Sequence, residues 1–396
     1  QGTLYGRNSI GGAINVVSKR PTDVFSADSR LTIGNFETTS IEASVAGPLS
    51  DKVRAKLAGS FRDQGEGYLE NVAGGPSEAG RGETSYLELQ LEADPTDNLS
   101  LWFKADTNSA DVYNRATNSS GSYDYSPFPT GNLTPGAAFG YLLPTYNQEG
   151  TATENPGIND IRKFSTNTPT KSKLDDSLGL STIATWSLPT IDIKYMGGYR
   201  TYVYDSYRDD DETSMVSYQY PLDPANVAAG EVFTGGPNCQ WYLENVGPIC
   251  SAATIYPSLT FGYIEDKSFW SHELNIQSTE DSDIWWIVGA YYFEEDFHQE
   301  SHFGNSAQPE IMAPYGAAPN PSGDYVTALS DLTTKSYALF GQVDYDLTDT
   351  VTLTGGLRYS SDEKAGSEQL RVIGYGIVPG FTLGGSGNLA PALDLT

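Results

Sequence analysis

The sequence has few cysteines, methionines, histidines and basic residues. Its 396 residues include two Cys, three Met and three His, and 23 Lys and Arg stand against 51 Asp and Glu, a formal net charge of −28. Because a phosphate-binding face needs clustered Lys and Arg, this balance argues against nucleic acid as a partner. With no CxxC pair and no Cys/His set, nothing favours a zinc site.

Long apolar runs are also missing. The longest nearly apolar stretch, Ile284–Phe293 (IWWIVGAYYF), is too short for a transmembrane helix, which needs ~20 residues, but fits a membrane strand of ~9–11. The mean hydropathy of −0.39 excludes a helical membrane protein. The sequence shows neither an initiator Met nor a signal peptide, so we expect a fragment or processed chain with any export signal upstream of Gln1.

Tyrosine (26) and glycine (41) are abundant, and apolar residues alternate with polar ones. In Tyr86–Ala93, the leucines and Ala93 share one face while Glu88, Gln90 and Glu92 share the other. This period of two is typical of β-strands. It predicts eleven strands, with edges uncertain by ~2–4 residues, at 26–35, 37–47, 52–63, 82–94, 99–111, 171–188, 190–206, 264–278, 284–300, 335–346 and 350–364.

The connections between these strands alternate in length. Short polar turns such as GPLSD (47–51) and DPTDN (94–98) are separated by long segments at 64–81, 112–170, 207–263, 301–334 and from 365 onward. Short turns at one end and long loops at the other are typical of transmembrane barrels. Strands of ~12–18 residues also exceed the ~5–6 of soluble sheets. We therefore predict an all-β fold, a transmembrane antiparallel up-and-down β-barrel.

The first line of the sequence, Gln1–Pro21, differs from the rest. Its GRNSIGG stretch (6–12) lacks the Lys-Ser/Thr pair that a phosphate loop needs, so nucleotide binding is disfavoured. The residues alone indicate a tight glycine turn that leads into a strand at Ala13–Ser18.

This stretch resembles the C-terminal end of the plug domain of TonB-dependent outer-membrane receptors. Later segments resemble the barrel of the same family in the expected order, including SHELNIQS (271–278), SYALFGQVDYDLTD (336–349) and VTLTGGLRYSSDEK (351–364). The matching plug-motif residues, to which the resemblance gives a structural or gating role, are Gly2, Thr3, Leu4, Tyr5, Gly6, Arg7, Gly11 and Gly12, followed by Ala13, Ile14, Asn15 and the Lys19-Arg20-Pro21 run.

The resemblance implies two domains: residues 1–20 as the end of a plug, and residues 21–396 as the N-terminal part of a truncated barrel. Such receptors have 22 strands around a plugged lumen, so about half the barrel is expected here. The implied function is uptake of a scarce nutrient, most commonly a ferric siderophore, across the bacterial (Gram-negative) outer membrane. The implied partners are TonB, through a region absent from this chain, the nutrient ligand, and outer-membrane lipid with lipopolysaccharide. Arg7 is hypothesised to pair with carboxylates of the barrel wall.

Other functions stay open. Within the family the ligand could be an oligosaccharide, haem or cobalamin. A passive porin is disfavoured because a plug tail precedes the first strand, and a secreted β-rich adhesin or enzyme because of the turn order. No Ser/His/Asp or paired-carboxylate arrangement stands out, so we expect no catalytic residue, no cofactor and no metal.

Several local features remain candidates. Cys239 and Cys250 lie in one outward loop and are predicted to form a disulfide, the alternative being two free thiols. The HQESH stretch (298–302) is interpreted as solvated residues at the base of a loop rather than metal ligands. The acidic run 209–212 is interpreted as a solvated loop tip, with divalent-cation binding as the alternative. The aromatic residues of loops 112–170 and 207–263 either cap a ligand or pack within the loops.

Overall fold

The structure is a computed structural model of the chain. It describes residues 17–71, 73, 79–114, 162–164, 166–210, 218–221, 239–242, 247–250, 252–255, 259–279, 284–304, 306–307, 309–314, 316–348, 350–374, 393–394 and 396.

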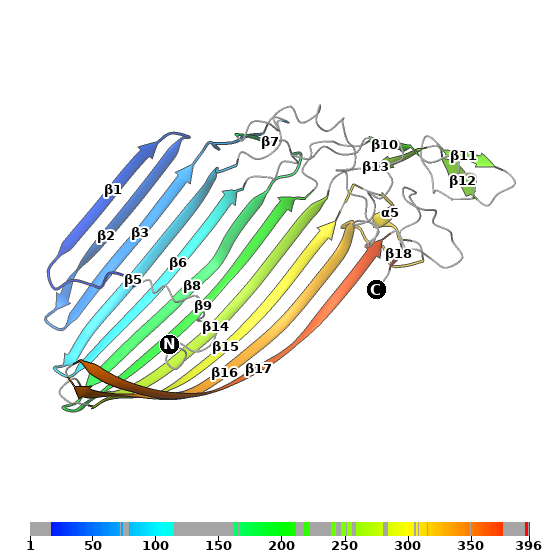
Figure 1. Ribbon diagram of the computed structural model, residues 1–396. Helices are drawn as coiled ribbons and strands as arrows, with labels where there is room; N and C mark the ends of the chain where they lie inside the picture. Colours follow the sequence, from blue (N-terminus) through cyan, green and yellow to red (C-terminus); the bar gives the residue numbers. More distant parts are fainter. Residues whose placement is uncertain are drawn as a thin grey trace.

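One curved antiparallel sheet dominates the molecule (Figure 1). It has twelve strands, of which β18 (Leu393–Asp394) has two residues, and the other eleven pair in chain order. These are β1 (Ser26–Gly34), β2 (Thr38–Ser50), β3 (Val53–Gln64), β5 (Gly82–Thr96), β6 (Leu99–Tyr113), β8 (Lys171–Ser187), β9 (Ile191–Asp209), β14 (Thr260–Ser278), β15 (Ile284–Gly304), β16 (Asp324–Thr348) and β17 (Val351–Gly374). The predicted all-β, up-and-down architecture of eleven strands is confirmed.

Several short strands and one short helix lie at the end of the sheet with the long connections (Figure 1). Two-residue strands β4 (Glu70–Asn71) and β7 (Lys163–Phe164) pair in parallel. A short helix, α5 (Pro309–Met312), lies between β15 and β16. Two further antiparallel pairs are β10 (Tyr218–Pro221) with β13 (Ala252–Ile255) and β11 (Cys239–Tyr242) with β12 (Gly247–Cys250).

The strands extend further than the alternation predicted at the end where the long connections lie. β16 begins at Asp324 rather than at 335, and β17 continues to Gly374 rather than 364. In these extensions most outward-facing residues are polar, such as Thr333, Asp331 and Ser367, so the hydrophobic period fades although backbone pairing continues. The loop between β15 and β16 is therefore 305–323, shorter than the predicted 301–334.

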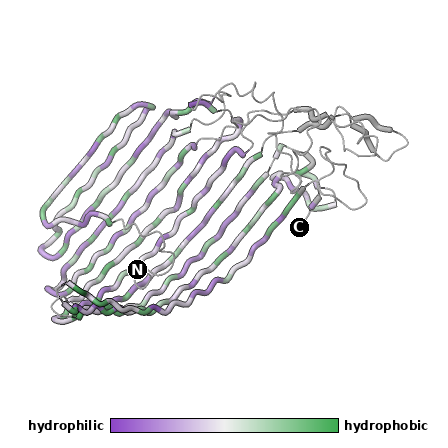
Figure 2. Tube along the Cα trace, in the orientation of Figure 1, coloured by the Kyte–Doolittle hydropathy of each residue, from purple (hydrophilic) through white to green (hydrophobic). Residues whose placement is uncertain are grey.

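Hydrophilic and hydrophobic residues alternate along the strands (Figure 2), so the two faces of the sheet differ in polarity. Because side chains alternate along a strand, paired residues lie on the same face. Leu57 pairs with Leu89, which pairs with Ala105, and the neighbouring row contains Lys56, Gln90 and Lys104. The first row belongs to a face rich in exposed apolar residues, which we call the apolar face, and the second belongs to the polar face. Leu357, on the apolar face, is 85% exposed.

In the part of the chain that the structure describes, the clusters of buried hydrophobic side chains lie at the end of the sheet with the long connections. Leu259, Ile311, Tyr325 and Ile373 form a buried cluster there. Among the described residues, no helix is long and apolar enough to cross a membrane.

Candidate functional site

The segment before β1, residues 17–25, lies against the polar face of the sheet, near the short-turn end of β3, β5 and β6 (Figure 1). The backbone carbonyl of Lys19 accepts hydrogen bonds from Lys56 Nζ (3.1 Å) and Gln90 Nε2 (3.2 Å). Ser18 Oγ accepts one from Lys104 Nζ (3.1 Å). This segment, which we call the tail, is thus bonded to three neighbouring strands.

Two further tail residues contact the same part of the polar face, which we call the wall. The guanidinium of Arg20 stacks over the ring of Trp102, 4.2 Å from its centroid. Arg54 Nη1 donates to Asp23 Oδ1 at 2.7 Å, while its Nη2 donates to Asp94. Cation–π and ion-pair contacts of this kind position the cation as well as attract it. The tail therefore crosses from β6 to β3 before it enters β1.

The wall beneath the tail is a connected charge network. Glu88, 4% exposed, accepts hydrogen bonds from Lys56 Nζ (2.6 Å), the Tyr86 hydroxyl (2.8 Å) and Gln90 Nε2 (3.0 Å). Its other neighbour, Lys104 Nζ, lies 3.4 Å away. Buried carboxylates persist only when they are paired and hydrogen-bonded, and Glu88 is both.

A second buried carboxylate, Asp106, extends the network across the sheet. It lies 3.3 Å from Lys104 Nζ and 2.8 Å from Arg200 Nη2. Gly179, the cross-strand partner of both Asp106 and Arg200, leaves the space that the guanidinium occupies; a Cβ there would collide with Arg200. The wall between β3 and β9 is thus preorganised by its own ion pairs.

Farther toward the long-connection end, the polar face carries an aromatic patch. The hydroxyls of Tyr202 and Tyr263 each donate to the carboxylate of Glu265, at 2.7 and 2.6 Å. Beside them, Lys267 Nζ pairs with Glu295 (2.7 Å). Further rings line the same face at Tyr204, Phe269, Phe293 and Phe297. Rings framing a few placed polar groups are typical of ligand-binding surfaces.

The apolar face carries a ladder of aromatic rings across the central strands. Trp270 packs on Tyr199 (4.3 Å between centroids) and stacks with His272, and Tyr292 packs on Tyr337 (5.1 Å). The next outward-facing residues of β15 and β16 form an ion pair, Glu294 with Lys335 at 3.1 Å. The apolar band therefore ends at a row of aromatic residues, as it does at a lipid–water interface.

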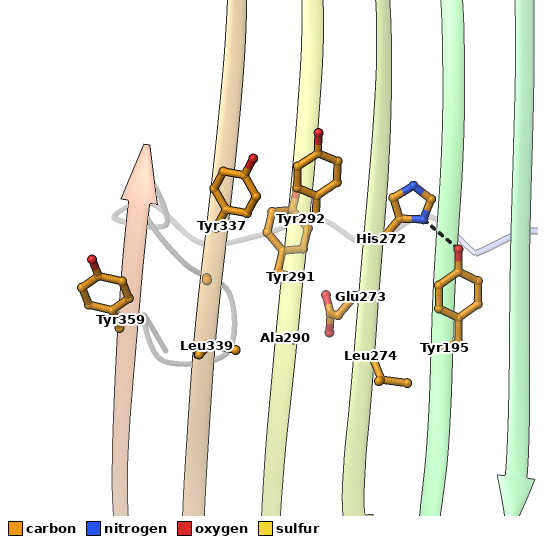
Figure 3. A pocket seen from close by; sticks show the side chains of 11 residues that line it. Tyr195, His272, Glu273, Leu274, Ala290, Tyr291, Tyr292, Tyr337, Leu339 and Tyr359 are labelled. Atoms are coloured by element: carbon orange, nitrogen blue, oxygen red, sulfur yellow. Dashed lines mark hydrogen bonds between the residues drawn. The ribbon is translucent and has the colours of Figure 1, made fainter. Parts of the chain in front are cut away.

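A hollow of about 620 Å³ interrupts this band (Figure 3). The Tyr195 hydroxyl and His272 Nδ1 are hydrogen-bonded at 2.7 Å on one side, and Tyr337 and Tyr359 stand on the other. Ala290 contributes the small side chain between them. The hollow opens on the apolar face, so it is a groove in the outer wall and separate from the polar face that carries the tail.

The rim at the long-connection end contains a histidine held by two carboxylates. His302 Nδ1 lies 2.9 Å from Asp324 Oδ2, and its Nε2 lies 2.6 Å from Glu300 Oε1. Burial lowers the pKa of His302, but the hydrogen bonds to Asp324 and Glu300 outweigh it, so the pKa lies above its usual value of 6.5. Asn320 donates to the backbone oxygens of Ile311 and Asp324, which fixes the loop carrying α5. We call this arrangement the rim clasp.

The sequence-predicted sites have different outcomes. The plug-motif residues at positions 2–12, Arg7 among them, lie outside the described residues, so the pairing of Arg7 with the barrel wall stays a prediction. Cys239 and Cys250 are direct cross-strand partners in the β11–β12 pair, and their disulfide stays a prediction. His298 and His302 belong to β15 rather than to a loop base, and each contacts a carboxylate. Within the described part of the chain, no three His, Cys, Asp or Glu side chains could hold a metal ion.

The acidic run at 209–212 was interpreted incorrectly at its first residue. Asp209 is 3% exposed and accepts a short hydrogen bond from Thr166, so it anchors a connection against the strand tops. Asp210 pairs with Arg208 (2.9 Å). Asp211 and Glu212 lie outside the described residues, as do most residues of the two aromatic loops.

A sheet of this length, with an apolar outer band, an aromatic boundary and a charged inner face that carries an N-terminal segment, is the wall of a membrane β-barrel. Consistent with this, residues 102–395 match the family model "TonB dependent receptor-like, beta-barrel". The match covers well over half of the chain, so the protein belongs to this family, as its motifs predicted.

Solved structures agree in fold. The ferric yersiniabactin uptake receptor FyuA from Yersinia pestis aligns with a TM-score of 0.57 at 14% identity, over 94% of this chain and 47% of that one. The ferripyoverdine receptor of the outer membrane of Pseudomonas aeruginosa aligns with a TM-score of 0.53 at 14% identity, over 94% and 42%. The chain thus spans less than half the length of these similar receptors.

Proposed function

We propose that the complete protein is an outer-membrane receptor that takes up a scarce nutrient, with energy delivered by TonB. The chain's family membership supports this, and so does the division of the sheet into an apolar outer wall and a charged inner wall. Residues 1–20 would be the end of the plug, and residues 21–396 the first part of the barrel. No part of the proposal requires catalysis or a resident cofactor.

The observation that carries the proposal is the tail seated on the polar face. A passive porin keeps its polar lumen open to water, whereas here the lumenal side of β3, β5 and β6 is occupied by the protein's own N-terminal segment. A filled lumen prevents leakage, and transport through it requires the filling to rearrange. A secreted adhesin would have no use for an exposed apolar band bounded by aromatic rings.

A ferric siderophore is the ligand we favour. The aromatic patch around Tyr202, Tyr263 and Glu265 lies on the lumenal wall toward the long loops, where an incoming ligand would arrive. Ring faces and a tyrosine-held carboxylate suit a ligand that carries aromatic groups. The similar receptors are named for ferric yersiniabactin and ferripyoverdine. Haem, cobalamin and oligosaccharides are the alternatives.

The remaining partners follow from the location. The apolar band would face lipid, with lipopolysaccharide beside the aromatic row on the outer leaflet. TonB would engage a region outside this chain. On the extracellular side, the cross-strand register of Cys239 and Cys250 supports a disulfide that closes the β11–β12 hairpin.

A growth assay tests the function. A deletion strain under iron limitation would be supplied with single iron sources (a ferric catecholate, a ferric hydroxamate, a mixed aromatic siderophore, or haem), with oligosaccharide and cobalamin uptake measured in parallel. We expect the intact gene, but not the empty vector, to restore growth on one ferric siderophore. Tyr263→Ala should reduce this rescue, whereas Tyr345→Ala, on the apolar face, should not. Rescue by haem alone would replace the siderophore assignment with haem. If no iron source restores growth but oligosaccharide or cobalamin is taken up, that nutrient would replace the siderophore as the ligand.

A further inference from the structure

We propose that residues 18–23 of the tail are a fixed anchor that remains on the barrel wall during transport. The rearrangement that admits ligand would then leave these residues in place. The inference deepens the proposed function and rests on it, because an anchor of this kind matters only if the plug moves.

The contacts of the tail are distributed so that no single movement releases them. Ser18 is bound to β6, the Lys19 carbonyl to β3 and β5 together, and Asp23 to β3. The side chain of Arg20 adds a further contact, because its guanidinium stacks over the ring of Trp102 on β6. Pro21, between these contacts, is buried and has a restricted φ. A rigid displacement of the tail would therefore break contacts to three strands at once.

The groups that hold the tail are themselves fixed in place. Lys56 and Lys104 each reach the tail while paired to the buried Glu88, and Lys104 also contacts Asp106. Gln90 donates to both Glu88 and the Lys19 carbonyl, and its own Oε1 accepts from Trp102 Nε1 at 3.0 Å. Releasing the tail would leave each of these groups with one acceptor fewer, although each keeps its contact with Glu88, and a lost hydrogen bond is costly in a partly desolvated wall.

The wall network also explains why the anchor lies here and not farther along the sheet. The three strands contribute Lys56, Glu88, Gln90, Trp102 and Lys104 from one contiguous area of the polar face. A surface built only to line a water-filled lumen needs no acceptor from another segment. Here Lys56 and Gln90 converge on the Lys19 carbonyl, and a carbonyl is kept when the side chain of Lys19 changes. Ser18, Arg20 and Asp23 are held through their side chains, so the site recognises both the path of the tail and its sequence at these positions.

The test is to tether the tail to the wall and measure transport. In the full-length receptor, Ser18→Cys/Lys104→Cys would be joined by a short, reducible bis-methanethiosulfonate reagent, with loss of free thiol reporting completion. Each single-cysteine variant, treated in the same way, is the matched control. The Arg20→Cys/Trp102→Cys pair repeats the test with Lys56, Glu88 and Lys104 intact, in case the Lys104 variant does not fold. The readout is accumulation of the ferric siderophore that wild type transports.

We expect the tethered receptor to accumulate ligand at the rate of its single-cysteine controls, before and after reduction. Loss of uptake on tethering, restored by reduction, would overturn the anchor and show that the tail must leave the wall. If wild type itself accumulates no ligand of any class, the proposed function fails, and that outcome is separate from either result of the tether.

Discussion

At the scale of single residues, Glu88 is the centre of the lumenal wall. It is the carboxylate that both Lys56 and Lys104 contact, and it is almost completely buried. Removing one member of a buried ion pair costs more than the pair contributes, because the remaining charges stay buried without compensation.

Glu88→Gln therefore should destabilise the folded barrel by about 3 kcal/mol. The matched control on the same strand is Glu92→Gln. The partner of Glu92, Arg54, still pairs with Asp23 and Asp94, so we expect this substitution to lower the free energy of unfolding by about 0–1 kcal/mol. The measurement is the urea midpoint of the heat-modifiable folded form in detergent or lipid. Equal midpoints for the two variants would show that the network does not stabilise the wall.

The network illustrates what residue patterns can and cannot predict. Alternation placed Glu88, Gln90 and Glu92 on one polar face, and the structure agrees. It did not reveal that Lys56, Glu88 and Lys104 meet, because this depends on the register of three strands, and register is set by pairing over the whole sheet. The contacts with residues 18–23 join positions about 30–90 apart in sequence, which no local pattern encodes.

At the scale of elements, the rim clasp ties the α5 loop to β15 and β16. Past Tyr292 the outward residues of β15 are polar, so His302 lies beyond the apolar band and outside the membrane-spanning part. The charged groups that face it are Glu300 on its own strand and Asp324 from β16, with Ser322 and Thr327 also bonded to Asp324.

The clasp should weaken at alkaline pH. Because these carboxylates raise the pKa of His302 above about 6.5, its contribution to stability is complete below that pH and is lost as pH rises through the higher folded value. We expect hydrogen exchange, corrected for its intrinsic pH dependence, to show loop 305–323 less protected at pH 9 than at pH 6. His302→Gln should abolish this difference, whereas His298→Gln, whose partner Asp331 is exposed, should retain it. A pH difference that persists in His302→Gln would assign the effect to another group.

The ends of the elements were less predictable than their number. All eleven long strands were expected from alternation, yet β16 is longer by eleven residues at its start, since the prediction began at 335 and the strand begins at 324. The added part pairs with β15 and β17 through backbone hydrogen bonds that do not require an apolar face. Hydrophobic period marks the part of a strand that meets lipid, and so it underestimates strands that continue beyond it.

At the scale of the whole molecule, the account requires opposite solvents on the two faces of the sheet. Leu339 and Ser336 lie three residues apart on β16 but face opposite sides, with Leu339 63% exposed on the apolar face and Ser336 bonded to Asp362 on the polar face. Exposure of this kind is stable only where lipid covers the leucine.

Leu339→Arg should impair folding into bilayers, by up to about 2–4 kcal/mol if the position lies near the midplane. Ser336→Arg, on the lumenal side of the same strand, should fold as wild type does. The measurement is the yield of heat-modifiable barrel after refolding into phospholipid vesicles. The reverse order of the two yields would mean that the faces were assigned the wrong way round.

Fold and family were predictable because they depend on patterns that extend over the whole chain, namely alternation, the order of short and long connections, and a sequence of motifs. The site was not, because the lumenal wall forms only when strands distant in sequence pair in register. The aromatic patch shows this: Tyr202 and Tyr263 converge on Glu265 from neighbouring strands about 60 residues apart.

The central claim is that the plugged barrel performs energised uptake, and accumulation of a radiolabelled ferric siderophore by intact cells tests it most directly. Cells producing the full-length receptor would be compared with and without TonB, and with and without an uncoupler of the proton gradient. We predict that surface binding persists in all conditions while intracellular accumulation occurs only with TonB and an intact gradient. Accumulation that continues at the same rate without either would contradict the account and indicate a passive pore.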